Sequence, residues 1–425
     1  MLSDMTRFFF VLLVCLSCNN RSEEKLPSKK DSILENQIFW KDSIVNTGID
    51  TINTASIKIR LQQHLVQLPD GKSFYLNIPE GYQINVAAGL QKRLRFLAKS
   101  PDGRLFATDM YDRSDNHKGR VIIFENWNEK EKRFLNVITY LDKLHNPNQV
   151  AFYKNYIYIA ETGRLRRYKY ANGDLQPKDS GQTIAVFPDH GLSYKYGGWH
   201  LTRSISFKND KLYVAVGSSC NACIEKEALR ATVLEMNPDG TDVQFYARGL
   251  RNSVGLKWIG NQLWATGMGR DLIGPDKPED VFQQVDRNGF YGWPFYFQYQ
   301  QNIFSDEQFK DSARAEWVKE PPKAFLGFKA HSAPLGFEYL KNFDDVRLKN
   351  SVFVCLHGST SVWRQRGNAI VRVEANNNYT EIVSGFLTGK TDADRHGRPC
   401  DILMNNDHSF FFTDDLNGVL YYVFK

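Results

Sequence analysis

A pattern of two short β-strands occurs six times along this chain and constrains the fold more than any other feature. Each copy has an apolar strand, a turn, and a second strand in which an aromatic residue is followed two positions later by a small one. The aromatic residues are Phe106, Tyr158, Tyr213, Trp264, Phe353 and Phe411, and the small ones are Thr108, Ala160, Ala215, Thr266, Cys355 and Thr413. Most anchors lie roughly 50 to 60 residues apart, the period of a four-stranded propeller blade. The repeats therefore predict an all-β, six-bladed β-propeller with four-stranded blades.

The ends of the repeat series predict how such a ring closes. A third and a fourth strand follow most copies, but the last copy ends at "VLYYVFK" with no residues left for an outer strand. The strand-like segment "YQINVAAGL" (82–90) precedes the first copy. We expect this N-terminal strand to complete the last blade and cover both exposed edges. Separate sandwich domains are the alternative, and the regular repetition disfavours them.

The N-terminus predicts export. Arg7 precedes the apolar run "FFFVLLVCLSC", which is too short to span a bilayer comfortably and is typical of a signal peptide. The run ends at Cys18 in a lipobox-like sequence, which predicts a lipid anchor in the membrane and a periplasmic or outer-membrane lipoprotein. A plain cleaved signal is the alternative. We expect a signal peptide at 1–18, a tether at 19–67 and the propeller at 68–425.

Composition and cysteines narrow the function classes. The formal net charge is +6, and no Lys/Arg run or basic helix concentrates this positive charge. Nucleic-acid binding is therefore not expected. Export makes a disulfide between Cys220 and Cys223 plausible, as a loop staple or as a redox-active pair. Ile224 stands where a covalent haem site has histidine, and no second CxxC is near enough to favour zinc.

Polar side chains stand at the start of the first strand in every copy. In a propeller these strands line the central channel, so their entrance residues share one face. The entrance residues include Arg93, Arg95, His145, Asn146, Asn148, His200, Arg203, Arg251, Asn252, His331, Ser332 and Arg398. Loops after the second strands add Asp109, Asp112, Arg113, Arg164, Arg270, Asp271, His357, Arg364, Asp414 and Asp415. Because guanidinium groups pair with carboxylates, an arginine-rich pocket of this kind predicts a planar polyanionic ligand.

A series of motifs in this region resembles the sorbosone dehydrogenase family. They are "GGWHLTRSISF…LYVAVGSSCNAC", "ATVLEMNPDG", "GLRNSVGL", "GMGRDLIGPDKPEDV", "NGFYGWPF", "AHSAPLGF", "HGS" and "GRPCDI". The resemblance covers about residues 68 to 425. It implies a six-bladed propeller related to soluble glucose dehydrogenase, which uses pyrroloquinoline quinone (PQQ) and calcium. It also implies an extracytoplasmic enzyme that oxidises a sugar or alcohol and passes electrons to a cytochrome or quinone acceptor.

The resemblance assigns roles to residues of this chain. His200 matches the family's catalytic histidine and Arg251 the arginine beside the reactive carbonyls of the quinone. Gly269, Arg270 and Asp271 occupy the loop whose backbone carbonyls bind calcium in glucose enzymes. Arg398 matches a cofactor-carboxylate arginine, and together with residues expected from the strand mouths and rim loops the cofactor-binding set comprises Asn148, Arg203, Asn252, Arg270, His331, Arg364 and Arg398. The sequence departs from the family at "HGSTSVWRQRG", where Arg364 or Arg366 replaces the expected basic contact, and at His396, which replaces an aromatic residue.

The leading functional hypothesis is therefore a PQQ- and calcium-dependent dehydrogenase of sugars or related alcohols and aldehydes. Neutral His200 would act as general base, since its ordinary pKa lies near the working pH. One alternative is a calcium-dependent hydrolase or lactonase, which would need a ring of Glu, Asn and Asp ligands on the axis. Another is a non-catalytic carbohydrate-binding or surface-assembly propeller.

Overall fold

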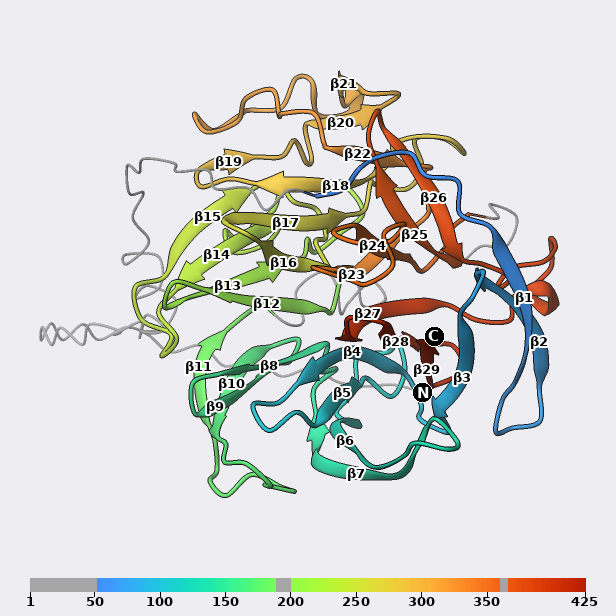
Figure 1. Ribbon diagram of the computed structural model, residues 1–425. Helices are drawn as coiled ribbons and strands as arrows, with labels where there is room; N and C mark the ends of the chain where they lie inside the picture. The colour runs from blue at the N-terminus through green and yellow to red at the C-terminus, as the bar shows by residue number, and fades with distance from the viewer. Residues whose placement is uncertain (1–51, 189–199, 360–365) are drawn as a thin grey trace, which may run out of the picture. The chain divides into compact units, whose positions relative to one another are not determined.

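The repeats form antiparallel β-sheets in the computed structural model of the protein, which describes residues 52–188, 200–359 and 366–425 (Figure 1). All of these residues belong to one compact unit, Ile38–Lys425. Within these ranges there is no α-helix; the helical turns are the 3-10 helices η1 (Glu307–Phe309) and η3 (Asp392–Asp394). In the described part of the chain, no helix has the length and apolarity needed to cross a membrane.

The first three copies of the repeat form three neighbouring sheets. Blade 1 consists of β4 (Leu94–Lys99), β5 (Leu105–Asp109), β6 (Gly119–Asn128) and β7 (Arg133–Leu144). Blade 2 consists of β8 (Gln149–Tyr153), β9 (Tyr156–Ala160), β10 (Arg164–Lys169) and β11 (Gln182–Val186). Blade 3 consists of β12 (Arg203–Lys208), β13 (Lys211–Val216), β14 (Thr232–Met236) and β15 (Gln244–Arg248), with the two-residue β19 (Gly289–Phe290) added in parallel at its outer edge.

The last three copies form the other blades. Blade 4 consists of β16 (Leu256–Ile259), β17 (Gln262–Gly267), β18 (Asp280–Val285) and β22 (Leu326–Phe328). Blade 5 consists of β23 (Pro334–Tyr339), β24 (Val352–Leu356), β25 (Ala369–Glu374) and β26 (Asn378–Val383). Blade 6 consists of β27 (Pro399–Asn406), β28 (Ser409–Asp414), β29 (Val419–Phe424) and β3 (Gln83–Ala88). The expected N-terminal strand is thus found as β3, antiparallel to β29 with Asn85 opposite Tyr422.

The first strands of the blades stand around a common centre (Figure 1). Each contacts the next in the order β4, β8, β12, β16, β23 and β27, and β27 contacts β4 again. The inner strands therefore form a complete circle. The prediction of an all-β, six-bladed propeller with four-stranded blades is confirmed, with β19 as an addition to blade 3.

The small residue of the repeat has a structural role, which is clearest in the three copies where this residue is threonine. Thr108 Oγ1 accepts a hydrogen bond from Phe96 N at 3.1 Å and donates one to Asn148 O, in the next blade, at 2.7 Å. Thr266 makes the same pair of bonds, with Gly255 N and Leu335 O. Thr413 repeats it a third time. These three hydroxyls join the inner strands of neighbouring blades, and we call them the threonine clamps.

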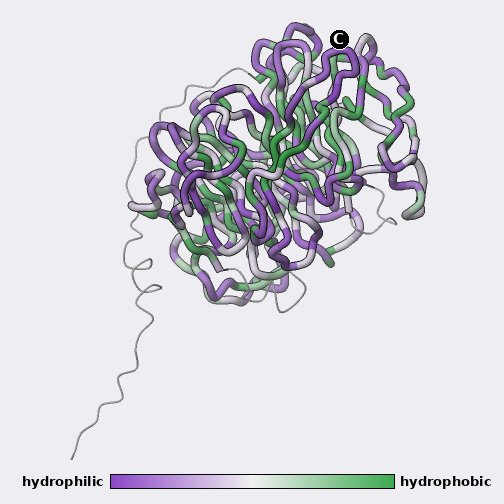
Figure 2. Tube along the Cα trace, turned by 90° about the horizontal axis from the view of Figure 1, so that it is seen from below, coloured by the Kyte–Doolittle hydropathy of each residue, from purple (hydrophilic) through white to green (hydrophobic). Residues whose placement is uncertain are grey.

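The aromatic residue of each repeat is buried between blades, and hydrophobic residues are concentrated in the strands, with hydrophilic ones in the loops (Figure 2). Phe106 packs edge-on against Phe152 of blade 2, with ring centroids 5.0 Å apart. Phe353 of blade 5 packs in the same way against Phe410 of blade 6. Burying a side chain of this size contributes roughly 1.5–3 kcal/mol. The repeated aromatics thus supply the apolar contacts that hold one blade against the next.

Two hairpins add to the blades. The hairpin of β1 (Leu61–Gln67) and β2 (Ser73–Pro79) lies at the end of blade 5, where Asn77 N donates to Ser384 O at 2.9 Å. The strand β1 therefore lies inside the segment expected as a tether at 19–67. Between β18 and β22 the chain forms a second hairpin of β20 (Tyr296–Tyr299) and β21 (Asn302–Ser305).

Candidate functional site

The loops at the mouths of the inner strands surround a cavity of about 570 Å³. Seven residues expected to form the site line it: His200, Arg251, Asn252, Gly269, Asp271, His331 and Arg398. Arg93, Arg95, Arg113, Asp280 and His357 also line it. Side chains far apart in the sequence are thus brought to one place, as the phase of the repeats predicted.

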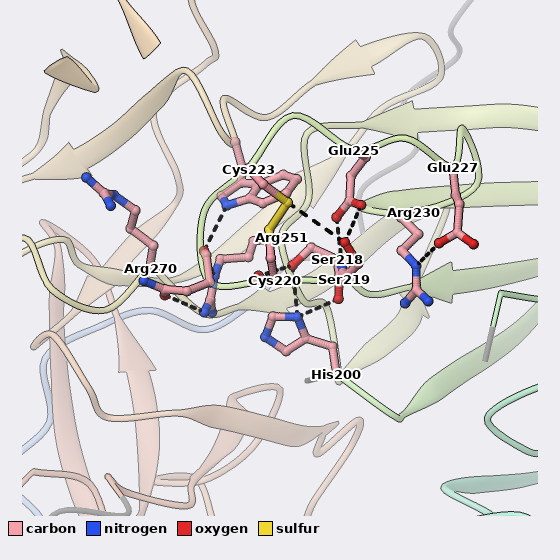
Figure 3. Close-up of a disulfide and its surroundings, with 12 residues drawn as sticks. His200, Ser218, Ser219, Cys220, Cys223, Glu225, Glu227, Arg230, Arg251 and Arg270 are labelled. Carbon is pink, nitrogen blue, oxygen red and sulfur yellow. Dashed lines mark hydrogen bonds and ion pairs between the residues drawn. A yellow bond between two sulfur atoms is a disulfide. The ribbon is translucent and has the colours of Figure 1, made fainter. Parts of the chain in front are cut away.

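His200 stands at the wall of this cavity in the left-handed backbone region, with φ of 53° (Figure 3). Its Nδ1 lies 2.9 Å from Ser218 O and 2.8 Å from Ser218 Oγ. A carbonyl oxygen can only accept, so Nδ1 carries the proton and Nε2 carries the lone pair. Burial, followed by the charge of Arg251, lowers the pKa of His200 well below its ordinary value. The imidazole is therefore neutral near pH 7, with Nε2 as its basic atom.

Arg251 and Asn252 enter the cavity from the loop before blade 4. Arg251 is buried, and burial lowers its pKa to about 10, so the guanidinium stays charged at neutral pH. Its Nε donates to Asn221 O at 2.9 Å and its Nη2 to Asn221 Oδ1 at 3.0 Å. Asn252 and His200 approach each other over Gly217, where a Cβ would come within 2.8 Å of Asn252 Oδ1 and 2.7 Å of His200 Cβ.

Arg398 lies at the start of blade 6. Its Nε donates to His357 O at 3.0 Å and its Nη2 to Gly358 O, while its main-chain N donates to Asp414 Oδ1 at 2.9 Å. Burial lowers the pKa of Arg398 to about 9. The side chain is thus a buried cation held by carbonyl oxygens at the cavity wall.

Asp415 is the centre of a buried charge cluster beside Arg398. It accepts from Arg93 Nη2 at 2.8 Å, Arg95 Nη1 at 2.7 Å and His357 Nε2 at 2.7 Å. Burial and the charge of Arg398 lower the pKa of His357 to about 3, so this histidine is neutral and donates its Nε2 proton. We call these residues the Asp415 cluster.

The expected calcium loop lies in blade 4, after β17. Gly269 N donates to Asp280 Oδ1 at 2.8 Å, and Asp280 Oδ2 accepts from Ala333 N at 2.7 Å. Burial raises the pKa of Asp280 to about 6. Asp271 Oδ1 lies 3.2 Å from His331 Nδ1. Asp271 and Asp280 thus place carboxylate oxygens at this loop, and oxygen is the donor that calcium prefers.

Three expected side chains lie elsewhere than in the cavity wall. Arg203 donates to the main-chain oxygens of His200, Thr202 and Pro188 at 2.8–2.9 Å, so it supports the backbone beneath His200. The Asn148 side chain accepts from Arg95 and donates to main chain and hydroxyl in blade 3.

Arg270 is the third of these side chains. It turns outward to Asp306, beside η1, with Nε 2.6 Å from Asp306 Oδ2. Its side chain therefore bonds the segment between β18 and β22, and only its main chain belongs to the loop at the cavity.

The remaining expected sites fall in two groups. Cys220 and Cys223 form a disulfide beside His200 and Arg251 (Figure 3). Cys18 and Arg364 lie outside the described residues. Ser218, Asn221 and Asp280 hold the expected site residues but were not predicted as part of the site, whereas Asp415 was expected only as a rim residue. Of these, Ser218 and Asn221 carry a sequence signal, because they belong to the "SSCNAC" motif itself.

The fold is shared with several solved carbohydrate-active enzymes. The PQQ domain of pyranose dehydrogenase from Coprinopsis cinerea, in its holo form, is 14% identical and superposes with a TM-score of 0.66 over 85% of this chain and 100% of that chain. A calcium structure of a Trichoderma reesei enzyme of family AA12 is 14% identical, with a TM-score of 0.65 over 87% and 98%. The PQQ-bound aldose sugar dehydrogenase of Streptomyces coelicolor is 16% identical, with a TM-score of 0.54 over 82% and 99%.

Sequence comparison gives a more specific answer. No curated protein matches this chain. The family described as TrAA12-like matches residues 77–425, which include every blade and the whole described cavity. The chain therefore belongs to the TrAA12-like family.

Proposed function

We propose that this protein is a PQQ-dependent oxidoreductase that oxidises a sugar or a related alcohol or aldehyde. The observation that carries the proposal is the arginine-rich cavity with neutral His200 in its wall. Membership of the TrAA12-like family supports it, as does the fold shared with enzymes whose names include PQQ. An aldose is one substrate class within this proposal, and the sequence motifs that resemble the sorbosone dehydrogenase family support it.

The charge of the cavity fits the cofactor. Five arginines line it against two aspartates, Asp271 and Asp280. PQQ carries three carboxylates, and guanidinium groups bind carboxylates through paired, charge-assisted hydrogen bonds. Arg251 and Arg398 would hold these carboxylates from opposite sides, with Arg113 at the exposed rim. A calcium-dependent hydrolase is less well supported. It would need acidic calcium ligands on the axis of the propeller, where these arginines lie instead.

The residues around His200 suit the removal of a proton. PQQ, when bound, supplies the two-electron acceptor chemistry of the reaction. His200 Nε2 would take the proton of the substrate hydroxyl while Ser218 O holds the Nδ1 proton and fixes the ring. Arg251 would hold positive charge beside the position where negative charge develops. This chain thus provides a base, its orienting partner and a nearby cation.

Calcium is part of the same proposal. The main-chain oxygens of Gly269 and Arg270 and the carboxylate of Asp271 would hold the ion, with Asp280 supporting the loop through Gly269 N. The guanidinium groups in the cavity wall cannot coordinate a cation, so the ion would depend on main-chain and carboxylate oxygens.

Reconstitution tests the proposal directly. Purified protein would be loaded with PQQ and Ca²⁺, and dye reduction would be assayed across aldoses, ketoses and sugar alcohols. We expect reduction that depends on PQQ and is lost with chelator. If the protein binds no PQQ, the function is wrong, and a carbohydrate-binding propeller becomes the better hypothesis.

Export as a lipoprotein is proposed from the sequence around Cys18. A Cys18→Ala form is expected to leave the membrane fraction of the cell and remain soluble after export. Equal retention of both forms in the membrane would contradict the anchor. If the protein is exported, an electron acceptor such as a cytochrome or quinone would have to reach it in the compartment to which it is exported.

A further inference from the structure

One loop of blade 3 contacts His200, Arg251 and the expected calcium loop. This loop, Ser218–Cys223, is closed on itself by the Cys220–Cys223 disulfide (Figure 3). At its start, Ser218 O accepts from His200 Nδ1, and Ser218 Oγ donates to Cys220 O at 2.9 Å. The hydroxyl proton is thereby directed at Cys220, which leaves its lone pairs facing His200.

Asn221 occupies the middle of this loop, between the two half-cystines. Its side-chain Oδ1 accepts from Asp271 N at 2.8 Å, and its Nδ2 donates to Asp271 O at 3.0 Å. The same Oδ1 accepts from Arg251 Nη2 at 3.0 Å, and the main-chain oxygen of Asn221 accepts from Arg251 Nε at 2.9 Å. Trp293 Nε1 lies 3.4 Å from that main-chain oxygen. One residue therefore bonds both the arginine and the expected calcium loop.

The chemistry of these contacts requires an amide. An acceptor is needed for Asp271 N and Arg251, and a donor is needed for Asp271 O, on one planar group. Aspartate would provide the acceptors without the donor, and alanine neither. The disulfide restricts the backbone on both sides of Asn221, so the side chain meets its partners with little freedom left to lose.

We propose that Asn221 is a positioning residue that fixes the Arg251 guanidinium and the Gly269–Asp271 loop relative to each other, with the Cys220–Cys223 disulfide holding it in place. The ligand that benefits is PQQ with calcium, so this part of the inference rests on the proposed function. The positioning of Asp271 by Asn221, which is the geometric part, does not rest on it, because this contact is made in the protein without any cofactor.

Hydrogen–deuterium exchange tests the geometric part without any cofactor. In Asn221→Ala the Asp271 amide loses its acceptor, and we expect exchange of a peptide spanning Gly269–Asp271 to quicken about tenfold or more. Asn221→Asp keeps an acceptor and is expected to fall between Asn221→Ala and the wild type. Asn237→Ala is a matched control in an outer turn of the same blade, where Asn237 bonds Thr241 and Lys211, and it should leave this peptide unchanged.

Cofactor titration tests the second part. PQQ with Ca²⁺, titrated calorimetrically, should bind about 10- to 100-fold more weakly to Asn221→Ala, the usual effect of losing a residue that supports direct ligands. Replacing Cys220 and Cys223 together by serine should shift both measurements in the same direction by a smaller factor.

The outcomes separate the two claims. If Asp271 exchange in Asn221→Ala stays at the wild-type rate, or rises only together with exchange across the whole chain, the positioning role is wrong. Unchanged PQQ affinity in that variant would also overturn it. If the wild type binds no PQQ while Asp271 exchange still quickens locally in Asn221→Ala, the proposed function fails and the positioning of Asp271 by Asn221 stands.

Discussion

The arginines of the Asp415 cluster and the arginine on the side of blade 3 are held in different ways. At the Asp415 cluster, Arg93 and Arg95 both pair with one buried carboxylate. On the side of blade 3, Arg251 is held by the main-chain and amide oxygens of Asn221, which carry no net charge. Both arrangements fix buried guanidinium groups, the first through one shared carboxylate and the second through contacts that include the neutral oxygens of Asn221.

This difference suggests a division of roles. A buried ion cluster is costly to disrupt, because removing one partner leaves the others desolvated and unmatched. Arg251 lies in the cavity wall with His200, where its charge acts on a ligand in the cavity. We therefore expect changes at the Asp415 cluster to act mainly on stability, and changes around Arg251 and His200 to act mainly on binding and turnover.

The largest effect is expected at His200. His200→Ala should lower the dehydrogenase rate by roughly two to four orders of magnitude, the usual contribution of a positioned base. PQQ should remain bound, since its carboxylates would be held by arginines such as Arg398. Steady-state rates and PQQ titration of the same preparation check this, and a rate equal to that of the wild type would refute the role.

The Asp415 cluster should give the largest change in stability. Asp415→Asn removes the charge that matches Arg93 and Arg95, and should lower the free energy of unfolding by about 3–5 kcal/mol. Denaturant unfolding measures this, with Asp239→Asn in an exposed turn as the control. A loss below about 1 kcal/mol would remove the contrast between the two sides.

Arg251 should show the opposite profile. Arg251→Ala removes a cation that would bond the ligand, and should weaken PQQ binding by roughly 10- to 100-fold, the range of charge-assisted hydrogen bonds. Turnover should fall as well, while the midpoint of unfolding without cofactor changes less than in Asp415→Asn. Calorimetry and denaturant unfolding of both variants side by side decide the matter.

The smallest effect concerns pH. Burial holds the pKa of His357 at about 3, whereas the unfolded chain has its ordinary value near 6.5, so the unfolded state takes up a proton first as pH falls. Stability should therefore decline below pH 6.5, and this histidine accounts for about 2 kcal/mol between pH 7 and pH 5. His357→Gln keeps a donor to Asp415 but does not titrate, so its unfolding free energy should vary less over that range. Equal pH dependence in both proteins would show that the pKa of His357 is the same in the folded and unfolded states.

The ring was predictable because its determinants are local and repeated. The aromatic and small residues recur at the same positions of each repeat. Residues at one such position make equivalent contacts in their own blades, as the threonine clamps show. The same phase also predicted which side chains would gather at the cavity, including His200, Arg251 and Arg398.

The direction of individual side chains was not predictable in this way. Arg203 and Arg251 both stand at strand mouths, yet Arg203 turns back to three main-chain oxygens before its strand. Arg270 turns to Asp306 in an insertion that has no counterpart in the other repeats. A long side chain follows the nearest acceptors, and these depend on irregular loops that carry no period.

The threonine clamps also bear on how the protein opens. Each hydroxyl bridges a seam between blades, and a blade that separated there would leave a donor and an acceptor unmatched in the interior. Separation at any of these three seams is therefore costly, and the blades that they join are expected to unfold together. The floor of the cavity then depends on contacts between blades, while the loops above it depend on local bonds such as those of Asn221. Motions that admit a ligand should belong to those loops, and the strand mouths should stay fixed through every cycle of binding and release.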